Sequence, residues 1–554
     1  MMNMKRNIIL ISVLALSGTL FAQSDDRNPI VNVENDYDPV VIEATKLSFT
    51  PSPKTASEGT PVECRYSNEG VPFKGFTSTK DIADVLPKKD YEYPDYVRLG
   101  YGLTNDIDAK ACFNFNVGKR GVLRTTASFD GFKTGLGGLY DNTEWDSRLF
   151  RTTAGIGYTL NSKYLKLDVD GKFNNDVFNY QSYDTPLTNK QNSRSYLADV
   201  NGVSKHDGAF QYDFNASFGY LARSYSSGVE NGIGEGRYAA GFGLGYEIEN
   251  DILHSIGLDM NVDGLIYEKR LRELGRGYVN TTSIDVAPNL TFSFDEWILK
   301  VGTRMNFITD GASLFAIAPD IHVEKNLLSN FTVFGSIVGD RTLNSFASLD
   351  KITPYWGLNE DQCHMYKPTY KIVDLNMGLR YSLADLSINV LGGYAYTKDD
   401  MLQNYSAPIV GWSPLVFVDF VQSNTHDLFV SARVGYNIFS WVKLSAAARY
   451  DFWSCSNRDW LRMKPEVTAD VDVEARFIED LTVRVGFNYT FYTKGETLGR
   501  INHRYDLNAR VNYQINKNFG VYMDGSNLLN CKYYDYAGYM ARGARGSLGL
   551  TMSF

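Results

Sequence analysis

The sequence predicts an all-β protein, a transmembrane antiparallel up-and-down β-barrel of about 22 strands. Three observations predict this fold: segments of about ten residues with alternating apolar and polar side chains, connections that alternate between short and long, and an aromatic-rich composition. The chain has 554 residues, with 48 Gly and 37 Tyr, and 14% of its residues are aromatic. Such a composition excludes a largely disordered chain. The net charge of −9 provides no basic surface for nucleic acid.

The first residues indicate export. Lys5 and Arg6 precede a short apolar run that ends near Leu16, and Ala22 precedes Gln23. A basic start, a short apolar run and a small residue at the cleavage point are typical of a secretory signal. We therefore expect a signal peptide over residues 1–22. No later stretch approaches the ~18 apolar residues that a spanning helix needs, which excludes a helical membrane bundle.

Proline sets the next segment apart. Eight of the 16 prolines lie between residues 29 and 94. Because proline cannot donate a ladder hydrogen bond, this segment forms neither regular sheet nor a long helix. We expect a proline-rich periplasmic or lumenal head over residues 23–94, followed by the barrel over residues 95–554.

The barrel prediction depends on strict alternation along each strand. In residues 505–515 the odd positions are apolar and the even positions are polar or charged. Period two produces one apolar face and one polar face. The length of such segments matches the ~9–11 residues of a tilted membrane strand. We expect Leu507 and Val511 to face lipid, and Asn508 and Asn512 to face a polar lumen where substitutions are tolerated.

Turns supply the strand count. Short polar turns are predicted at Lys119-Arg120, Asn161-Ser162, His206-Asp207, Asn250-Asp251, Asp295-Glu296, Asn326, Ala384-Asp385, Ser440, Glu479-Asp480 and Asn516-Lys517. Longer loops such as residues 341–368 and 398–426 lie between them. Short turns at one end and long loops at the other are typical of outer-membrane barrels. Ten short turns join 20 strands. A first strand at Tyr96–Thr104 and a last strand at Gly546–Phe554 bring the number to 22. Residues 399–427 leave room for another hairpin.

The last strand carries an assembly signature. Leu548, Leu550, Met552 and Phe554 alternate with smaller or polar residues, and the chain ends on an aromatic side chain. This ending resembles the signal by which the barrel assembly machinery recognises outer-membrane barrels. We expect that machinery and outer-membrane lipid as partners, and the bacterial outer membrane as the location.

One motif resembles a known family. Asn527, Leu528, Leu529 and Asn530, followed by Tyr533 and Tyr534, are similar to the carboxy-terminal end of the TonB-dependent receptors, over about 50 residues. Met552 departs from the pattern, because the family usually has an aromatic residue there. Near the other end is a segment similar to the one that pairs with TonB by strand addition: Val40, Val41, Ile42, Glu43, Ala44 and Thr45. The alternative is a β-prone segment without a partner.

The main departure from the family concerns its plug domain. Only 49 residues, from Leu47 to Asp95, separate the TonB-box-like segment from the barrel. The resemblance therefore implies a short form that lacks a complete plug. A 22-stranded barrel normally has a plugged lumen, so we expect the long loops, the head or a second envelope protein to close it.

Function follows from the resemblance, which implies uptake of an unidentified solute across the outer membrane. A plugless structural or assembly subunit of an outer-membrane complex and a passive porin remain alternatives. We find no catalytic or cofactor motif, no paired histidines and no metal-binding spacing, so we expect no enzyme activity, cofactor or metal. Cys363, Cys455 and Cys531 fall in long loops, either as free thiols or with one disulfide. Charged side chains predicted to face the lumen either line a permeation path or form ion pairs of the wall: Lys166, Asp168, Asp170, Lys172, Arg484, Arg504, Asp506 and Arg510.

Overall fold

The computed structural model describes the barrel and most of its loops. The described residues are 95–137, 144–182, 190–205, 209–224, 232–248, 250, 252–273, 277–309, 314–328, 330–357, 365–406, 415–497 and 499–554. The predicted signal peptide, the head over residues 23–94, the segment Val40–Thr45 and Cys363 lie outside these ranges. They stay predictions.

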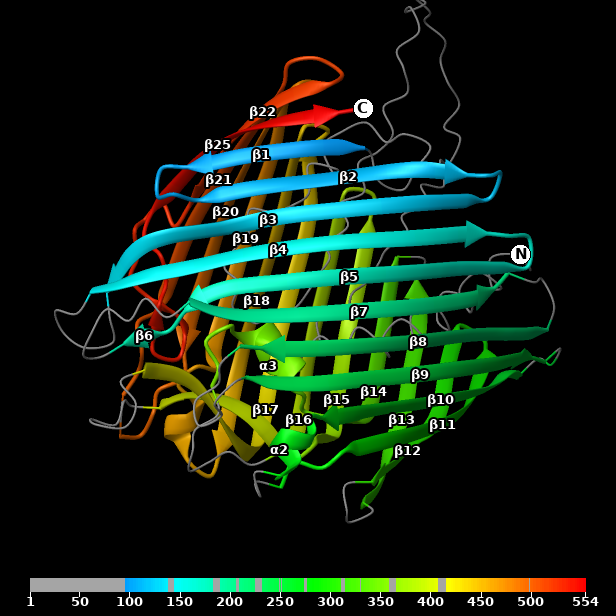
Figure 1. The fold of residues 1–554 in the computed structure, drawn as a ribbon. Coiled ribbons are helices and arrows are strands. Elements are labelled where there is room, and N and C mark those ends of the chain that lie inside the picture. The colour runs from blue at the N-terminus through cyan, green and yellow to red at the C-terminus, as the bar shows by residue number, and fades with distance from the viewer. Residues whose placement is uncertain are drawn as a thin grey trace, which may run out of the picture. The chain divides into compact units, whose positions relative to one another are not determined.

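Twenty-two strands form the wall (Figure 1). They are β1 (Tyr96–Gly102), β2 (Ile107–Val117), β3 (Gly121–Gly137), β4 (Glu144–Asn161), β5 (Leu165–Asn179), β7 (Lys190–Ser204), β8 (Phe210–Arg223), β9 (Ile233–Glu247), β10 (Leu253–Tyr267), β11 (Thr281–Phe294), β12 (Trp297–Thr309), β13 (Leu314–Leu328), β14 (Phe331–Thr342), β15 (Thr369–Leu383), β16 (Leu386–Ser406), β17 (Leu415–Phe439), β18 (Val442–Cys455), β19 (Pro465–Ile478), β20 (Leu481–Tyr492), β21 (Arg504–Gln514), β22 (Phe519–Ser526) and β25 (Arg545–Ser553). The loops hold β6 (Gln181–Ser182), β23 (Tyr534–Tyr536), β24 (Tyr539–Met540), α2 (Lys269–Glu273), α3 (Phe346–Ile352) and a 3-10 turn at Arg458–Leu461.

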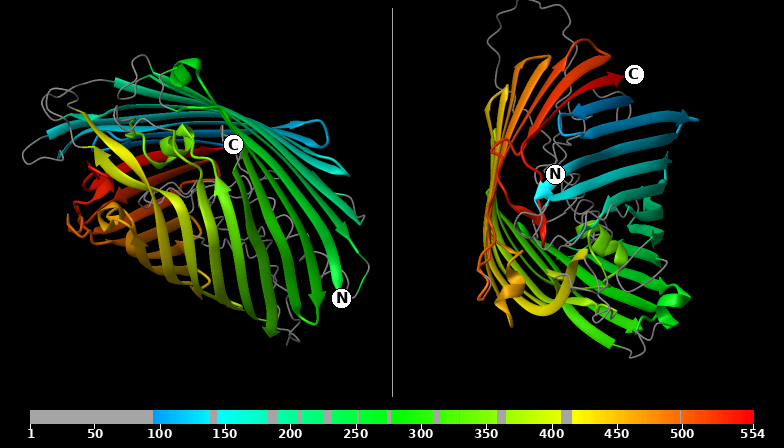
Figure 2. Two further views of the ribbon diagram at one scale, coloured as in Figure 1. Left: turned by 90° about the horizontal axis from the view of Figure 1, so that it is seen from below. Right: turned by 60° about the vertical axis from the view of Figure 1, so that its left-hand side comes forward.

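The wall is closed and antiparallel. Each wall strand pairs with the strands before and after it in the chain, and β1 pairs with β25 from Tyr96↔Ser553 to Gly102↔Ser547. Figure 2 shows the strands following one another around the interior. Closure leaves no unpaired edge, as backbone in a bilayer requires. The predicted fold class and strand number are confirmed.

The connections alternate as predicted. Where the structure describes them, the predicted short turns fall between consecutive strands, except that Asn161 is the last residue of β4 and Asn326 lies inside β13, which continues to Leu328. Asp295 and Ala384 adopt positive φ angles of 46° and 37° there, as tight turns require. The possible extra hairpin at 399–427 is not a separate pair of strands. Instead, β16 and β17 lengthen to 21 and 25 residues and stay paired as far as Ser406↔Phe417.

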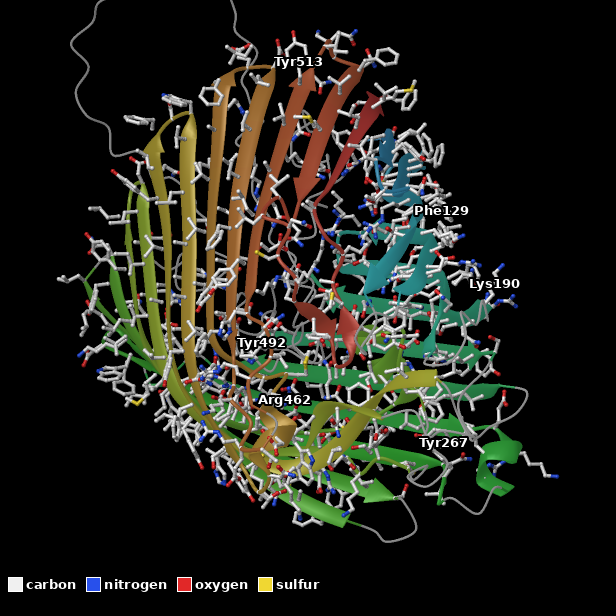
Figure 3. All side chains as sticks on the ribbon, turned by 90° about the vertical axis from the view of Figure 1, so that its left-hand side faces the viewer. Phe129, Lys190, Tyr267, Arg462, Tyr492 and Tyr513 are labelled. Carbon is white, nitrogen blue, oxygen red and sulfur yellow. The ribbon has the colours of Figure 1, made fainter. Side chains whose placement is uncertain are left out.

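The two faces of the wall differ in chemistry. Large apolar side chains project outward, such as Leu548, 65% exposed, and Leu550, 60% exposed. Figure 3 shows Phe129 on the outer side of the wall. Trp297 and Trp441, next to short turns, are exposed as an interfacial aromatic girdle would be. Among the described residues, no helix is long and apolar enough to cross a membrane.

Most of the predicted lumen charges form ion pairs of the wall. Arg484 lies 3.1 Å from Asp472, and Arg504 lies 2.9 Å from Asp506. Seven of the eight predicted charges have such a partner; the other pairs are Lys166–Asp168, Arg124–Asp170 and Arg510–Asp524. The interpretation of these residues as wall ion pairs, rather than a permeation path, therefore fits the structure better.

The two faces predict an asymmetric response to charge. Leu507→Arg places a guanidinium on the lipid side of β21 and should destabilise the barrel by ~2–4 kcal/mol near the midplane. Asn512→Arg, on the lumen side of the same strand, should cost less than ~1 kcal/mol because water solvates it. Denaturant unfolding in detergent or lipid measures both, and equal losses would contradict the assignment of the faces.

Candidate functional site

The long-loop mouth of the barrel contains a folded cap. We define the cap as residues 343–357 with α3, the hairpin β23–β24, β6, and the start of β17 at residues 415–420. Figure 1 shows α3, β6 and the start of β17 at the same end of the barrel. These segments come from the β14–β15, β22–β25, β5–β7 and β16–β17 connections, so distant parts of the chain meet here.

A dry aromatic core holds the cap together. Trp356, Val416 and Val418 are fully buried, with 0% of their surface exposed. The rings of Tyr355 and Tyr539 stack with centroids 4.1 Å apart, which joins residues 343–357 to the β23–β24 hairpin. Further buried members from wall and loops are Trp145, Phe178, Tyr180, Phe346, Phe417 and Met463. Aromatic packing of this extent stabilises the closed arrangement of the loops.

Backbone hydrogen bonds join the same segments. Trp356 forms a parallel bridge with Val418, and the Val418 N–H donates to the Tyr355 carbonyl at 2.9 Å. The Tyr539 hydroxyl donates to the Val416 carbonyl at 2.6 Å. Buried backbone groups therefore find partners inside the cap, so the cap is a folded structure rather than loose loops.

The wall anchors α3 through a buried carboxylate. Ser345 caps the helix, and its side chain accepts from the Ser348 N–H in a capping box. Glu235 on β9, which is fully buried, accepts from the N–H groups of Phe346 at 2.7 Å and Ala347 at 3.2 Å. These N–H groups begin the helix and have no partner within it, so Glu235 ties α3 to the wall.

A buried guanidinium anchors the rest of the β14–β15 segment. Arg223, at the end of β8, lies 3.0 Å from Asp350, donates to the Trp356 carbonyl at 2.9 Å, and stacks 4.2 Å from the Trp356 ring centroid. Its side chain is 0% exposed. Asp350 also accepts from Ser193 on β7 at 2.9 Å. Three wall strands, β7, β8 and β9, thus anchor this segment.

The family motif positions the last loop. Asn527 and Asn530 have φ angles of 45° and 51°, a region that asparagine tolerates better than most residues. The Asn527 side chain donates to the carbonyls of Cys531 and Arg542 at 3.0 and 2.9 Å, and its backbone N–H donates to Asp506 at 3.0 Å. The motif therefore builds the tight turn that sends the β22–β25 loop toward the cap.

Other predicted site residues take clear places. Tyr533 donates to Asp506 at 3.2 Å beneath the same turn, whereas Leu528 and Leu529 are exposed. Asn508, expected to tolerate substitution, is fully buried and accepts from the Asn527 N–H at 3.2 Å, so that expectation does not fit its contacts. The remaining motif residue, Tyr534, begins β23. Leu548, Leu550 and Phe554 are exposed on the wall, and their role in assembly stays a prediction.

Two of the three cysteines predicted in long loops lie among the described residues. Cys455 and Cys531 are free thiols, the first of the two alternatives. Within the described part of the chain, no group of three or more His, Cys, Asp or Glu side chains could hold a metal ion. What the arrangement does is join loops from four connections into one packed unit that is anchored to the wall. Its anchors, Arg223 and Glu235, belong to no sequence motif, and only their contacts reveal them.

The fold matches known outer-membrane receptors. No protein-family model and no curated protein matches the chain. Among solved structures, it is similar to the ferric-catecholate import receptor Fiu of E. coli K12 (TM-score 0.60, 10% identity, 84% of this chain, 83% of that chain). It is also similar to the ferric enterobactin receptor PfeA of Pseudomonas aeruginosa, with a TM-score of 0.61 and 9% identity, over 83% of this chain and 80% of that chain. A third similar structure is the FrpB iron transporter of Neisseria meningitidis, with a TM-score of 0.64 and 11% identity, over 85% of this chain and 82% of that chain.

These neighbours are TonB-dependent receptors with 22-stranded barrels, so the resemblance of the carboxy-terminal motif extends to the whole wall. The closed barrel with an apolar outer face is located in the bacterial outer membrane, as predicted. At these identities the likeness establishes the fold alone.

Removing the Arg223 anchor should loosen the cap. Arg223→Ala removes the guanidinium from Asp350, which is partly exposed and keeps its hydrogen bonds from Ser193 and Trp356, so the cost should fall below the ~3–5 kcal/mol of a fully buried pair. We expect higher single-channel conductance in a planar bilayer and faster proteolysis within residues 343–357. Arg484→Ala, which removes a wall ion pair near a short turn, is the matched control and should leave both unchanged. Identical conductance of the two variants would contradict the anchoring role.

Cap closure should depend on pH through Asp419. This residue lies in the first part of β17, before Thr425, which is the first β17 residue paired with β18. Burial raises the pKa of Asp419 to about 6. The hydrogen bond that its carboxylate accepts from the Phe420 N–H lowers the pKa, but by less than burial raises it. A raised carboxyl pKa stabilises the closed cap at low pH, and this contribution is lost as pH rises from the ordinary value of ~4 through 6. Conductance should therefore increase over that range, and Asp419→Asn should weaken the dependence.

Proposed function

We propose that the protein takes up a solute across the outer membrane through a lumen that the cap opens and closes. The cap is the observation that carries this proposal. Its core is dry and its anchors are buried charges on the wall, so closure is the stable state and opening has a defined energetic cost. A permanently open porin has no use for such a core, which argues against the passive alternative.

The structural neighbours support transport rather than a purely structural role. They include an import receptor for ferric catecholates, a ferric enterobactin receptor, an iron transporter and a copper transporter. These solutes differ from one another although the barrels are alike. The proposal for this chain is therefore uptake of a solute that is too large or too scarce for free diffusion, without a named ligand.

We also propose that uptake is coupled to TonB through residues Val40–Thr45. The support is the likeness of this segment to the family's strand-addition motif and the likeness of the wall to the family's barrel. Coupling would supply the energy that opens a cap held by buried contacts. The alternative, a structural or assembly subunit of an outer-membrane complex, predicts that the cap never opens.

A reversible lock on the cap tests the proposal. Gln181 and Val416 are register partners between β6 and β17, so Gln181→Cys with Val416→Cys should form a disulfide across the cap. In a background without the native cysteines, oxidation should abolish uptake of a solute on which growth depends, and reduction should restore it. Val200→Cys with Ala216→Cys, partners between β7 and β8, is the matched wall control and should not affect uptake. Unchanged uptake through an oxidised cap would contradict gating by the cap.

Coupling has a separate test. Val41→Pro and Ile42→Pro remove backbone donors that strand addition needs, so uptake should fall to the level of a TonB-deficient strain. The purified barrel should keep its wild-type conductance, because the cap is untouched. Unimpaired uptake by both variants would contradict coupling while leaving the cap proposal standing.

A further inference from the structure

The closing seam of the barrel has little backbone pairing. The ladder between β1 and β25 has seven residue pairs, and the flanking β1–β2 and β22–β25 ladders have six and eight. In contrast, β16 and β17 share nineteen pairs. The seam also joins the two ends of the barrel domain, so its closure has the highest entropic cost of any strand pair in the wall. Something besides the ladder must hold it.

Charged side chains cross the seam on the lumen side. Arg98 on β1 lies 2.9 Å from Asp108 on β2 and 3.3 Å from Asp524 on β22. The second contact passes over β25, which lies between β22 and β1. Arg510 on β21 donates to Asp524 at 2.7 Å. The Arg98, Arg510 and Asp524 side chains are at most 6% exposed, and the two cations and two carboxylates balance in charge.

An aromatic ring lies along the same path. Tyr522, Gly549, Gly100 and Asp108 form one straight row of register partners over β22, β25, β1 and β2. A Cβ atom on either glycine would collide with the Tyr522 side chain, so the ring occupies the space that the glycines leave open. The Tyr522 hydroxyl reaches Asp108 at 3.5 Å, and the Arg98 guanidinium lies 4.2 Å from the ring centroid.

We propose that Arg98, Tyr522 and Asp524 form a clasp that locks the closing seam from inside the lumen. The clasp bridges β22 to β1 and β2 across β25, so the seam cannot open between β1 and β25 without breaking the buried Arg98–Asp524 ion pair and the contacts of Tyr522 with Arg98 and Asp108. Similar ring-on-glycine contacts elsewhere in the wall, Phe214 on Gly202 and Tyr238 on Gly264, join only directly paired strands. The proposal concerns closure of the wall and does not depend on what the barrel transports.

The test combines clasp variants with a seam disulfide. The readout is the midpoint temperature at which half of the folded barrel, which migrates as a compact band on an SDS gel, is lost on heating. Arg98→Ala and Gly549→Ala, as separate variants, should each lower this midpoint by about 5 °C. Gly202→Ala, which creates the same kind of collision between β7 and β8, should lower it less. Val97→Cys with Met552→Cys, register partners across the seam, is then oxidised in each clasp variant in a background without the native cysteines.

The disulfide distinguishes a clasp from a general packing effect. We expect the seam disulfide to restore the midpoint temperature of both clasp variants. The disulfide between Val200→Cys and Ala216→Cys, placed between β7 and β8, should not restore it. A wild-type midpoint in both clasp variants would overturn the proposal. Restoration by both disulfides, or by neither, would overturn it as well, because the loss would then not arise from the seam.

Discussion

Closure of the wall through the pairing of β1 with β25 is the constraint on which the rest of the structure depends. In lipid, an unpaired strand edge leaves N–H and C=O groups without partners, so the chain must return its last strand to its first. That requirement sets the alternation of short turns and long loops and brings all long connections to one mouth. The cap exists because those connections meet there.

The cap is a candidate for the structure that fills the mouth of this wide barrel. A wall of this size encloses a lumen that needs an occupant. Residues 343–357, the β22–β25 loop and the start of β17 share an aromatic core. Arg223 and Glu235 connect this core to the wall. Separating a buried charge from its partner is costly, so these anchors stabilise the packed arrangement of the loops.

The wall could be predicted from the sequence because its signals are local. Period-two alternation in residues 505–515 and turn residues such as Ala384-Asp385 depend on near neighbours in the chain, and the asparagines of the Asn527–Asn530 turn suit its positive φ angles. The cap could not be predicted, because its contacts are not local. Arg223 contacts Asp350 across 127 residues of sequence, and Tyr539 contacts Val416 across 123, and no periodicity in the sequence relates these positions. For the same reason Asn508 looked like an ordinary lumen residue, although it supports the turn at Asn527.

The central claim is that the cap closes the lumen, and single-channel conductance of the purified protein tests it most directly. Wild type would be compared in a planar bilayer with a variant in which residues 345–356 are replaced by a short Gly-Ser linker. The account predicts a nearly silent wild type and a variant with large, stable channels. Equal conductance of the two proteins, whether both are silent or both are open, would contradict it.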